Sequence, residues 1–233
     1  MLKLLILSII SFLSISCNLQ AMDFYDGLQG DSGSNKEAKS SVIYYPMPKV
    51  GRQNDGWSCG INSGTKFLRY HGMATDYSEL KAIRKREMTS TGIKIPKFLQ
   101  ALDNANPVGL ALNNIHRLGT PPRVLRSMIN WQFIRFKSKK RVDIYWDQSM
   151  TDLRKHLESG PVIILIEPRE PYLHWIVVNG YDSSKNIFRI SETSDTDYHY
   201  TESLLKKKWL KWDGMLDWLP GVGLKEGTII TLK

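Results

Sequence analysis

The chain has 233 residues, of which 42% are hydrophobic, so it can bury a substantial core and is not disordered throughout. Its formal charge of +9, from 32 Lys and Arg against 23 Asp and Glu, favours acidic partners such as anionic lipid, cell-wall polymer or nucleic acid. The basic residues are scattered except at 137–141 and 206–208, and neither run carries a nucleic-acid motif, so no nucleic-acid partner is expected.

Residues 1–21 have the pattern of a secretory signal peptide. A short positive start at Lys3 precedes an apolar run from Leu4 to Ile15, and small or polar residues follow. The run is too short for a membrane-spanning helix. Cleavage after Ala21 would give a secreted or periplasmic protein.

A second interpretation of the same stretch is a lipoprotein signal that ends at Ser16. The sequence around Cys17 resembles a bacterial lipoprotein box, although Ser14 stands where that motif usually has leucine. Lipid attached to Cys17 would anchor the protein to a membrane. After either cleavage Cys59 has no cysteine to pair with inside the chain, and a lone thiol in an oxidising compartment favours chemistry over structure.

Residues 22–41 are predicted to be a flexible tether, because they are polar and glycine-rich and show no apolar periodicity. Residues 42–233 then form one domain. This domain opens with a short β-prone run at 42–45 that Pro46 ends.

A helix is predicted to begin at Cys59 and to end at His71, with Gly72 just beyond it. Its apolar stripe includes Ile61, Phe67 and Leu68. A thiol in the first turn meets unpaired N–H groups and the positive end of the helix dipole, which lower its pKa. Cys59 is therefore a candidate nucleophile; the alternative is a small buried apolar residue.

Further helices are predicted at 76–88, after Pro96 at 98–102, from Pro121 to Ile129, and at 149–158. Residues 131–145 are interpreted as strand and loop. Near the end, apolar residues recur every three or four positions, at Leu205, Trp209, Trp212, Leu216 and Leu219. This amphipathic helix is expected to pack on the core; the alternative is a cationic face that lies on an anionic membrane or lines the substrate groove.

Continuous apolar runs predict strands at 161–166, 173–181 and 187–192, and a last strand at 227–232. Helices cluster early in the chain and strands cluster late. The predicted fold is therefore α+β, with an antiparallel sheet in the C-terminal part.

His174 is the best candidate for the base that a nucleophilic thiol requires, because it opens an apolar strand that would hold the ring rigidly. His71 would lie roughly 18 Å from Cys59 along the same helix, since each residue adds about 1.5 Å. The other histidines have polar neighbours and no second ligand at metal spacing: His116, His156 and His199.

A hairpin in which Tyr181 faces Ile187 gives His174 an acidic neighbour. In that register His174 faces Ser194, and Glu192 is its diagonal neighbour on the same face. That face also carries Ile176 and other apolar residues, so it is expected to point toward the Cys59 helix. A shift of one residue would bring Asp195 opposite His174 instead, so Asp195 is the alternative acid.

Gln53, six residues before Cys59, could donate an amide N–H to a developing oxyanion. The order Gln53, Cys59-Gly60, Gly160-Pro161-Val162, His174 and Gly180-Tyr181-Asp182 resembles papain-like cysteine peptidases. The closest resemblance is to stand-alone relatives of the bacteriocin-processing (double-glycine leader) peptidases. It covers roughly Tyr45 to Asp195 and departs at Glu192-Thr193, where that family usually has Asp-Pro.

The resemblance implies a papain-like fold, with the helix that carries Cys59 packed on an antiparallel sheet, and a thiol site that cleaves amides. Cys59, His174, Glu192 and Gln53 would be its catalytic residues. A peptide or protein substrate is expected and no cofactor or metal, with anionic membrane or cell wall as a further contact. Three alternatives are a cell-wall amidase, an acyltransferase or transglutaminase, and a catalytically inactive peptide-binding module.

Overall fold

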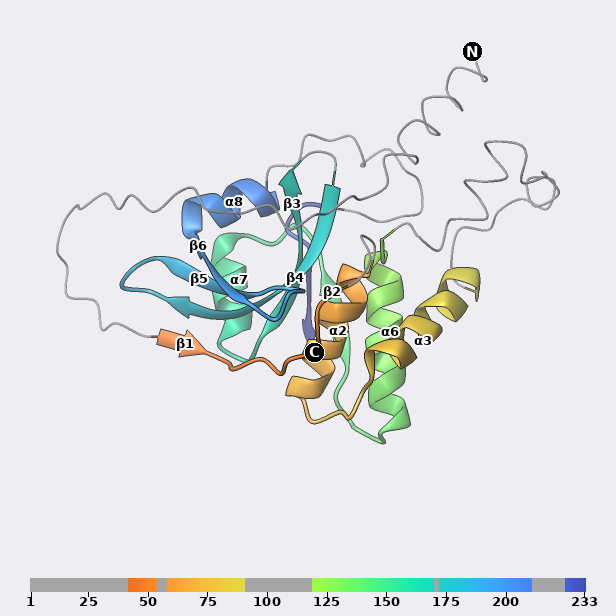
Figure 1. Cartoon of the computed structure of the whole chain (residues 1–233). Helices are drawn as coiled ribbons and strands as arrows, with labels where there is room; N and C mark the ends of the chain where they lie inside the picture. Colours follow the sequence, from red (N-terminus) through yellow and green to blue (C-terminus); the bar gives the residue numbers. More distant parts are fainter. Residues whose placement is uncertain (1–41, 54–57, 91–118, 170–171, 211–224) are drawn as a thin grey trace, which may run out of the picture.

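The computed structural model of the chain describes residues 42–53, 58–90, 119–169, 172–210 and 225–233 (Figure 1). The predicted signal peptide, the tether and the helix at 98–102 lie outside these ranges. Cys17, His116 and the end of the amphipathic helix, with Trp212, Leu216 and Leu219, also lie outside them.

A seven-stranded sheet, in which every strand pairing is antiparallel, forms the centre of the described part. The strand order is β2-β7-β3-β4-β5-β6, and β1 pairs with the end of β4. The strands are β1 (Val42–Tyr44), β2 (Val142–Tyr145), β3 (Val162–Arg169), β4 (Tyr172–Asp182), β5 (Ile187–Ser191), β6 (Asp197–Thr201) and β7 (Ile229–Leu232).

Helices cover both faces of this sheet (Figure 1). The helices are α2 (Cys59–Tyr70), α3 (Tyr77–Ser90), α6 (Pro122–Arg135), α7 (Met150–Leu157) and α8 (Glu202–Leu210). α2, α3 and α6 pack together against one face, while α7 and α8 pack against the other. The predicted α+β class is confirmed, with the cysteine helix on an antiparallel sheet.

Buried apolar residues form two separate cores, one on each face of the sheet, because side chains alternate between the faces along the central strands β3 and β4. Ile163, Leu165, Trp175 and Val177 face α2, α3 and α6, whereas the intervening residues face α7 and α8. β3 and β4 are apolar on both faces because each face is covered by helices.

The face assigned to the cysteine helix was predicted wrongly. Ile176, Val178, Phe188 and Ile190 pack with α7 and α8, and α2 covers the opposite face. The prediction assumed that a single helical layer covers the more apolar face. The structure has helices on both faces, so an apolar face does not by itself identify the layer that contains Cys59.

One element boundary and one strand also differ from the predictions. α6 continues to Arg135 because Gln132 and Phe133 extend its buried stripe, so only the end of residues 131–145 forms strand, β2. β6 was not predicted, since its sequence is polar and tyrosine-rich. The described part of the amphipathic helix, α8, buries Leu205 and Trp209, in agreement with core packing.

A β-bulge interrupts the pairing of β4 with β5. Near the turn Asp182 pairs with Ile187, but beyond the bulge Val177 pairs with Ser191. The predicted pairing of Tyr181 with Ile187 is wrong by one residue, because Tyr181 pairs with Phe188. The bulge shifts the register by one residue. Beyond it, on the side of His174, the pair of Val177 with Ser191 follows the predicted register.

No helix among the described residues has the length and apolar character needed to cross a membrane.

Candidate active site

Cys59 is the first residue of α2, and its side chain is 4% exposed. Ser58 precedes it as the N-cap residue and is buried, with its hydroxyl accepting a hydrogen bond from the Tyr77 hydroxyl. Cys59 is a free thiol. The sulfur therefore lies at the end of the helix where N–H groups are unpaired and the dipole favours a negative charge.

Close packing fixes this helix end against the sheet. A Cβ atom on Gly60 would lie 2.7 Å from Cβ of Thr120 and 3.0 Å from Cδ1 of Trp175. The Trp175 indole donates to the Thr120 carbonyl over 2.7 Å, and the Ser63 hydroxyl donates to the Trp175 carbonyl over 3.0 Å. Only glycine fits directly after the cysteine, and the helix is tied to the residue directly after His174.

The imidazole of His174 is hydrogen-bonded to the thiol of Cys59. Its Nε2 atom lies 2.8 Å from Oε1 of Glu192, which leaves Nδ1 for the thiol. The side chains of His174 and Glu192 are 18% and 21% exposed. The structure thus brings together three of the four predicted site residues, from α2, β4 and the residue after β5.

Glu192 is held by its own neighbours. Its Oε2 atom accepts from the Thr193 backbone N–H at 3.1 Å and from the Thr193 hydroxyl at 3.2 Å. The backbone N–H of Glu192 donates to the Thr196 carbonyl, and the N–H of Asp195 donates back to the Glu192 carbonyl. The carboxylate therefore stands at the start of a tight turn with one oxygen directed at His174.

Electrostatics at the site favour a thiolate beside an imidazolium. Burial would raise the pKa of Cys59, but the hydrogen bond and charge of His174, with the N–H groups of Trp175 and Gly60, lower it overall. Burial would lower the pKa of His174, but its bonds to Cys59 and Glu192 raise it well above its ordinary value. Burial would raise the pKa of Glu192, but His174 and then Thr193 lower it.

Asp195, the alternative acid, has different partners. Its carboxylate accepts from the backbone N–H groups of Val50 and Gly51 and forms an ion pair with Lys66. The carboxylate that contacts His174 is that of Glu192.

Gln53 lies on the segment that leads toward α2 and is partly buried. Its backbone N–H donates to the Thr193 carbonyl over 3.3 Å, so this segment runs beside the residue that follows Glu192. This contact brings Gln53 to the neighbourhood of the acid. Donation by its side chain to an oxyanion remains a prediction.

The other described histidines lie away from this cluster. His71 is the C-cap residue of α2 and packs edge-on against Phe67. His156 packs beside Tyr145, and His199 is exposed on β6. No group of three or more His, Cys, Asp or Glu side chains within the described ranges could hold a metal ion.

Two polar residues of α2 that were not predicted as site residues contact the turn that carries Glu192. Asn62 donates to the carbonyls of Gly51 and Thr193, and Lys66 contacts residues 191–195. Both are 1% exposed. The sequence spacing could have identified them. Asn62 and Lys66 lie three and seven residues after Cys59, so they share its face of the helix.

No family model matches the chain, and no curated protein matches it. Among solved structures, the chain is similar to a double-glycine motif protease from an AMS/PCAT transporter, crystallised in complex with the leader peptide. The match covers 82% of this chain and 94% of that chain, at 11% sequence identity and a TM-score of 0.47.

Proposed function

We propose that the chain is a papain-like cysteine peptidase that hydrolyses amide bonds in peptide or protein substrates. The observation that carries the proposal is the continuous hydrogen-bonded series Cys59, His174 and Glu192 at the start of a helix. A nucleophile, a base and a group that orients the base form the minimal machinery of acyl transfer.

In this mechanism the Cys59 thiolate attacks the carbonyl carbon of the substrate amide and forms a tetrahedral oxyanion. The imidazolium of His174 gives its proton to the leaving amine as the C–N bond breaks, which leaves a thioester on Cys59. Water, deprotonated by His174, attacks the thioester, and departure of the thiolate releases the carboxylic acid. Glu192 holds the ring in position and stabilises its positive charge.

The oxyanion needs hydrogen-bond donors placed in advance. The backbone N–H of Cys59, in the first turn of α2, is one candidate. The side-chain amide of Gln53 is the second, and the contact of Gln53 with Thr193 supports its proximity. Gln53→Glu, which replaces a donor by a negative charge, is expected to reduce kcat more than it raises KM.

Export is part of the same proposal. Residues 1–21 would direct the chain out of the cytoplasm, with the mature protein secreted, periplasmic or lipid-anchored through Cys17. N-terminal sequencing and intact mass of the mature protein distinguish cleavage after Ala21 from lipidation at Cys17. A mature protein that keeps Met1 would contradict export.

The deciding experiment is digestion of a peptide library by the wild type and by Cys59→Ala, with the products identified by mass. Cleavage by the wild type alone supports the peptidase. Release only from peptidoglycan fragments would indicate the amidase, and products that gain an added amine would indicate an acyltransferase. A wild type that turns over none of these, and whose binding is unaffected by Cys59→Ala, would contradict the proposal.

A further inference from the structure

Lys66 places a positive charge inside the protein, two helical turns after Cys59. Its side chain is 1% exposed. Burying a charged group costs several kcal/mol unless it is paired and fully hydrogen-bonded, so such a residue needs a specific set of partners.

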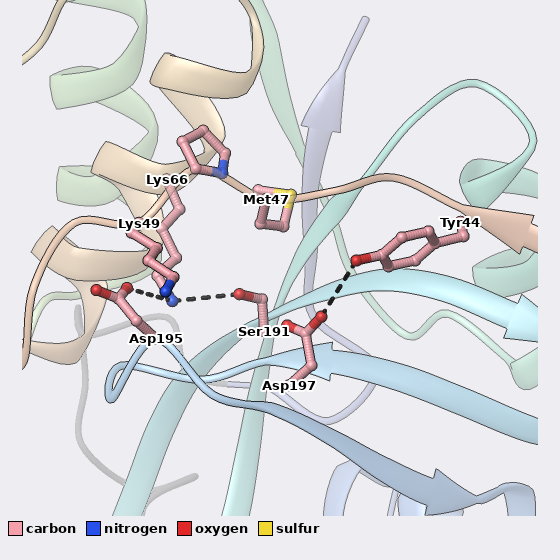
Figure 2. Close-up of a pocket in the computed structure, with 8 residues that line it drawn as sticks. Tyr44, Met47, Lys49, Lys66, Ser191, Asp195 and Asp197 are labelled. Carbon is pink, nitrogen blue, oxygen red and sulfur yellow. Dashed lines mark hydrogen bonds and ion pairs between the residues drawn. The ribbon is translucent and has the colours of Figure 1, made fainter.

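The described partners of Lys66 lie at the end of β5 and in the turn that carries Glu192 (Figure 2). The ammonium lies 3.2 Å from the Ser191 hydroxyl and 3.0 Å from Oδ1 of Asp195, and it donates to the backbone carbonyl of Glu192. An ammonium has three N–H donors, and here it has three acceptors. Both residues that flank the Glu192–Thr193–Ser194 stretch are therefore tied to the helix of the nucleophile.

Asp195 extends this connection to the segment that carries Gln53. Its carboxylate accepts from the N–H of Val50 at 3.0 Å and from the N–H of Gly51 at 2.5 Å. Asp195 has a φ of 60°, a left-handed conformation in which aspartate is among the more tolerated residues. The carboxylate thus meets the ammonium on one side and two backbone N–H groups on the other.

Asn62 makes a parallel link between the same parts. Its side-chain amide donates to the Gly51 carbonyl at 3.1 Å and to the Thr193 carbonyl at 3.4 Å. Asn62 and Lys66 lie one turn apart on the face of α2 that also bears Cys59. Two segments far apart in the sequence, residues 50–51 and 191–195, therefore converge at two buried polar side chains of one helix.

The segment that leads to Gly51 and the Glu192 turn do not close completely on each other at this point. A cavity of about 250 Å³ lies between them, lined by residues that include Met47, Lys49, Ser191 and Asp197 (Figure 2). The buried ion pair lies at the wall of this cavity. The hydrogen bonds of Asp195, with those of Asn62, therefore connect residues 50–51 to the turn, and Lys66 fixes the Asp195 carboxylate between them.

We propose that the Lys66–Asp195 ion pair is the positioning device of the active site, which holds the Glu192 carboxylate against His174 and the Gln53 segment beside it. The inference rests on the proposed function only in so far as the positioned residues take part in catalysis. The geometry it predicts around Cys59 can be measured without a substrate.

The test is the rate at which iodoacetamide alkylates Cys59 in the full chain, measured against pH by intact mass. Lys66→Met removes the ammonium and keeps an unbranched side chain. We expect its thiol to titrate at least about one pH unit higher than in the wild type, toward the free value of about 8.5, and to react about tenfold more slowly at pH 6. Asp195→Asn is expected to shift the curve in the same direction.

Two control variants distinguish a positioning effect of Lys66 from a general loss of stability and from the loss of any positive charge beside the cavity. Arg154→Met breaks a different ion pair, with Glu202, whose side chains are about one-third exposed. Lys49→Met removes an exposed lysine from the wall of the same cavity. Both are expected to keep the wild-type alkylation curve, even if thermal unfolding shows that Arg154→Met is less stable.

The double variant Lys66→Met/Asp195→Asn covers the case in which Lys66→Met fails to fold, because it leaves no unpaired buried charge. It is expected to fold and still to react slowly. Folded variants that alkylate as fast as the wild type at every pH would overturn the inference. A wild type that cleaves no peptide while the shift is still observed would overturn the proposed function alone.

Discussion

The imidazole Nε2 of His174 lies 2.8 Å from the carboxylate of Glu192 because β4 bulges next to Asn179. Continuing the register of the pair Asp182 and Ile187 without a bulge would place His174 opposite Asp195. Beyond the bulge the last pair of the two strands is Val177 and Ser191, and in this register Glu192, the next residue, is diagonal to His174 before the chain turns toward β6.

The bulged residue Asn179 is hydrogen-bonded to Tyr45, the residue directly after β1. The backbone N–H of Tyr45 donates to the Asn179 carbonyl over 2.8 Å, and the Asn179 side chain donates to the Tyr45 carbonyl over 3.1 Å. One extra residue in β4 therefore sets the register in which Glu192 follows the last strand pair and lies diagonal to His174.

Glu192→Gln is expected to reduce the reactivity of Cys59. The amide keeps the shape of the side chain but removes the negative charge that raises the pKa of His174. A less basic ring stabilises the thiolate less, so the alkylation curve moves to higher pH and kcat/KM falls at least about tenfold. Glu158→Gln, an exposed glutamate after α7, is the matched control, and an unshifted curve for Glu192→Gln would refute the assigned role.

The pH dependence of peptide hydrolysis by the wild type is expected to be bell-shaped. The pKa of Cys59 is lowered and that of His174 is raised, so the ion pair is populated between the two values. Activity should rise below pH 8.5, where a free thiol is still protonated, and should fall only well above 6.5, the ordinary value for histidine. A rise centred near 8.5 in initial-rate measurements would contradict a thiolate formed by His174.

Gly60→Ala is expected to destabilise the protein and to slow alkylation of Cys59. The added Cβ would overlap the Thr120 side chain at 2.7 Å, and Thr120 itself is fixed between Trp175 and Arg84. Overpacking at such a site costs about 1–3 kcal/mol. Urea unfolding measures this loss, with Gly119→Ala as the control, because nothing lies within 4 Å of a Cβ at Gly119.

His71 is expected to make the fold sensitive to acid. Burial lowers its pKa to about 4, and the nearby charge of Lys140 contributes. The unfolded chain, with the ordinary value of about 6.5, binds the proton first, so stability is complete above pH 6.5 and falls as the pH drops toward 4. We expect a loss of about 1–2 kcal/mol after solvent screening.

His71→Phe keeps a ring at this position without the titration, so its stability should vary less over this pH range. Equilibrium unfolding at pH 7 and pH 4.5 gives the comparison. His199→Gln, on the exposed β6, is the control. Identical pH dependence in the wild type and His71→Phe would show that other groups cause the loss.

Trp209→Ala is expected to cost about 3–5 kcal/mol of unfolding free energy, because a fully buried indole leaves a large cavity. The indole also donates to the Thr228 carbonyl over 3.3 Å. Lys207→Ala on the same helix is exposed and should change stability by less than about 0.5 kcal/mol. A small loss for Trp209→Ala would favour the alternative in which this helix serves a membrane.

Charge reversal on α8 tests the membrane alternative directly. If the cationic face of α8 contacts anionic membranes, Lys206→Glu/Lys207→Glu should abolish co-sedimentation with phosphatidylglycerol vesicles at low salt without lowering stability. Wild-type protein that stays in the supernatant would dispose of the membrane contact.

The sequence by itself determined which elements form and which residue types could do chemistry. The apolar runs of β3 and β4 could only be buried strands, and Cys59 had to lie at a helix start because the periodic stripe begins there. Ser149 and Asp152 form the capping box at α7, where a helix start was predicted. These features are local, because propensity, periodicity and capping act over a few residues.

Only the tertiary structure decided which residues meet. The bulge in β4 sets the partner of His174, the helices on both faces set the layer of Cys59, and the burial of Lys66 sets the position of the turn. Each of these depends on segments separated by more than a hundred residues, such as Lys66 and Asp195 or Tyr45 and Asn179. Contacts of that kind leave no periodic pattern in the sequence, because their energy comes from burial and pairing that exist only when the whole chain has folded.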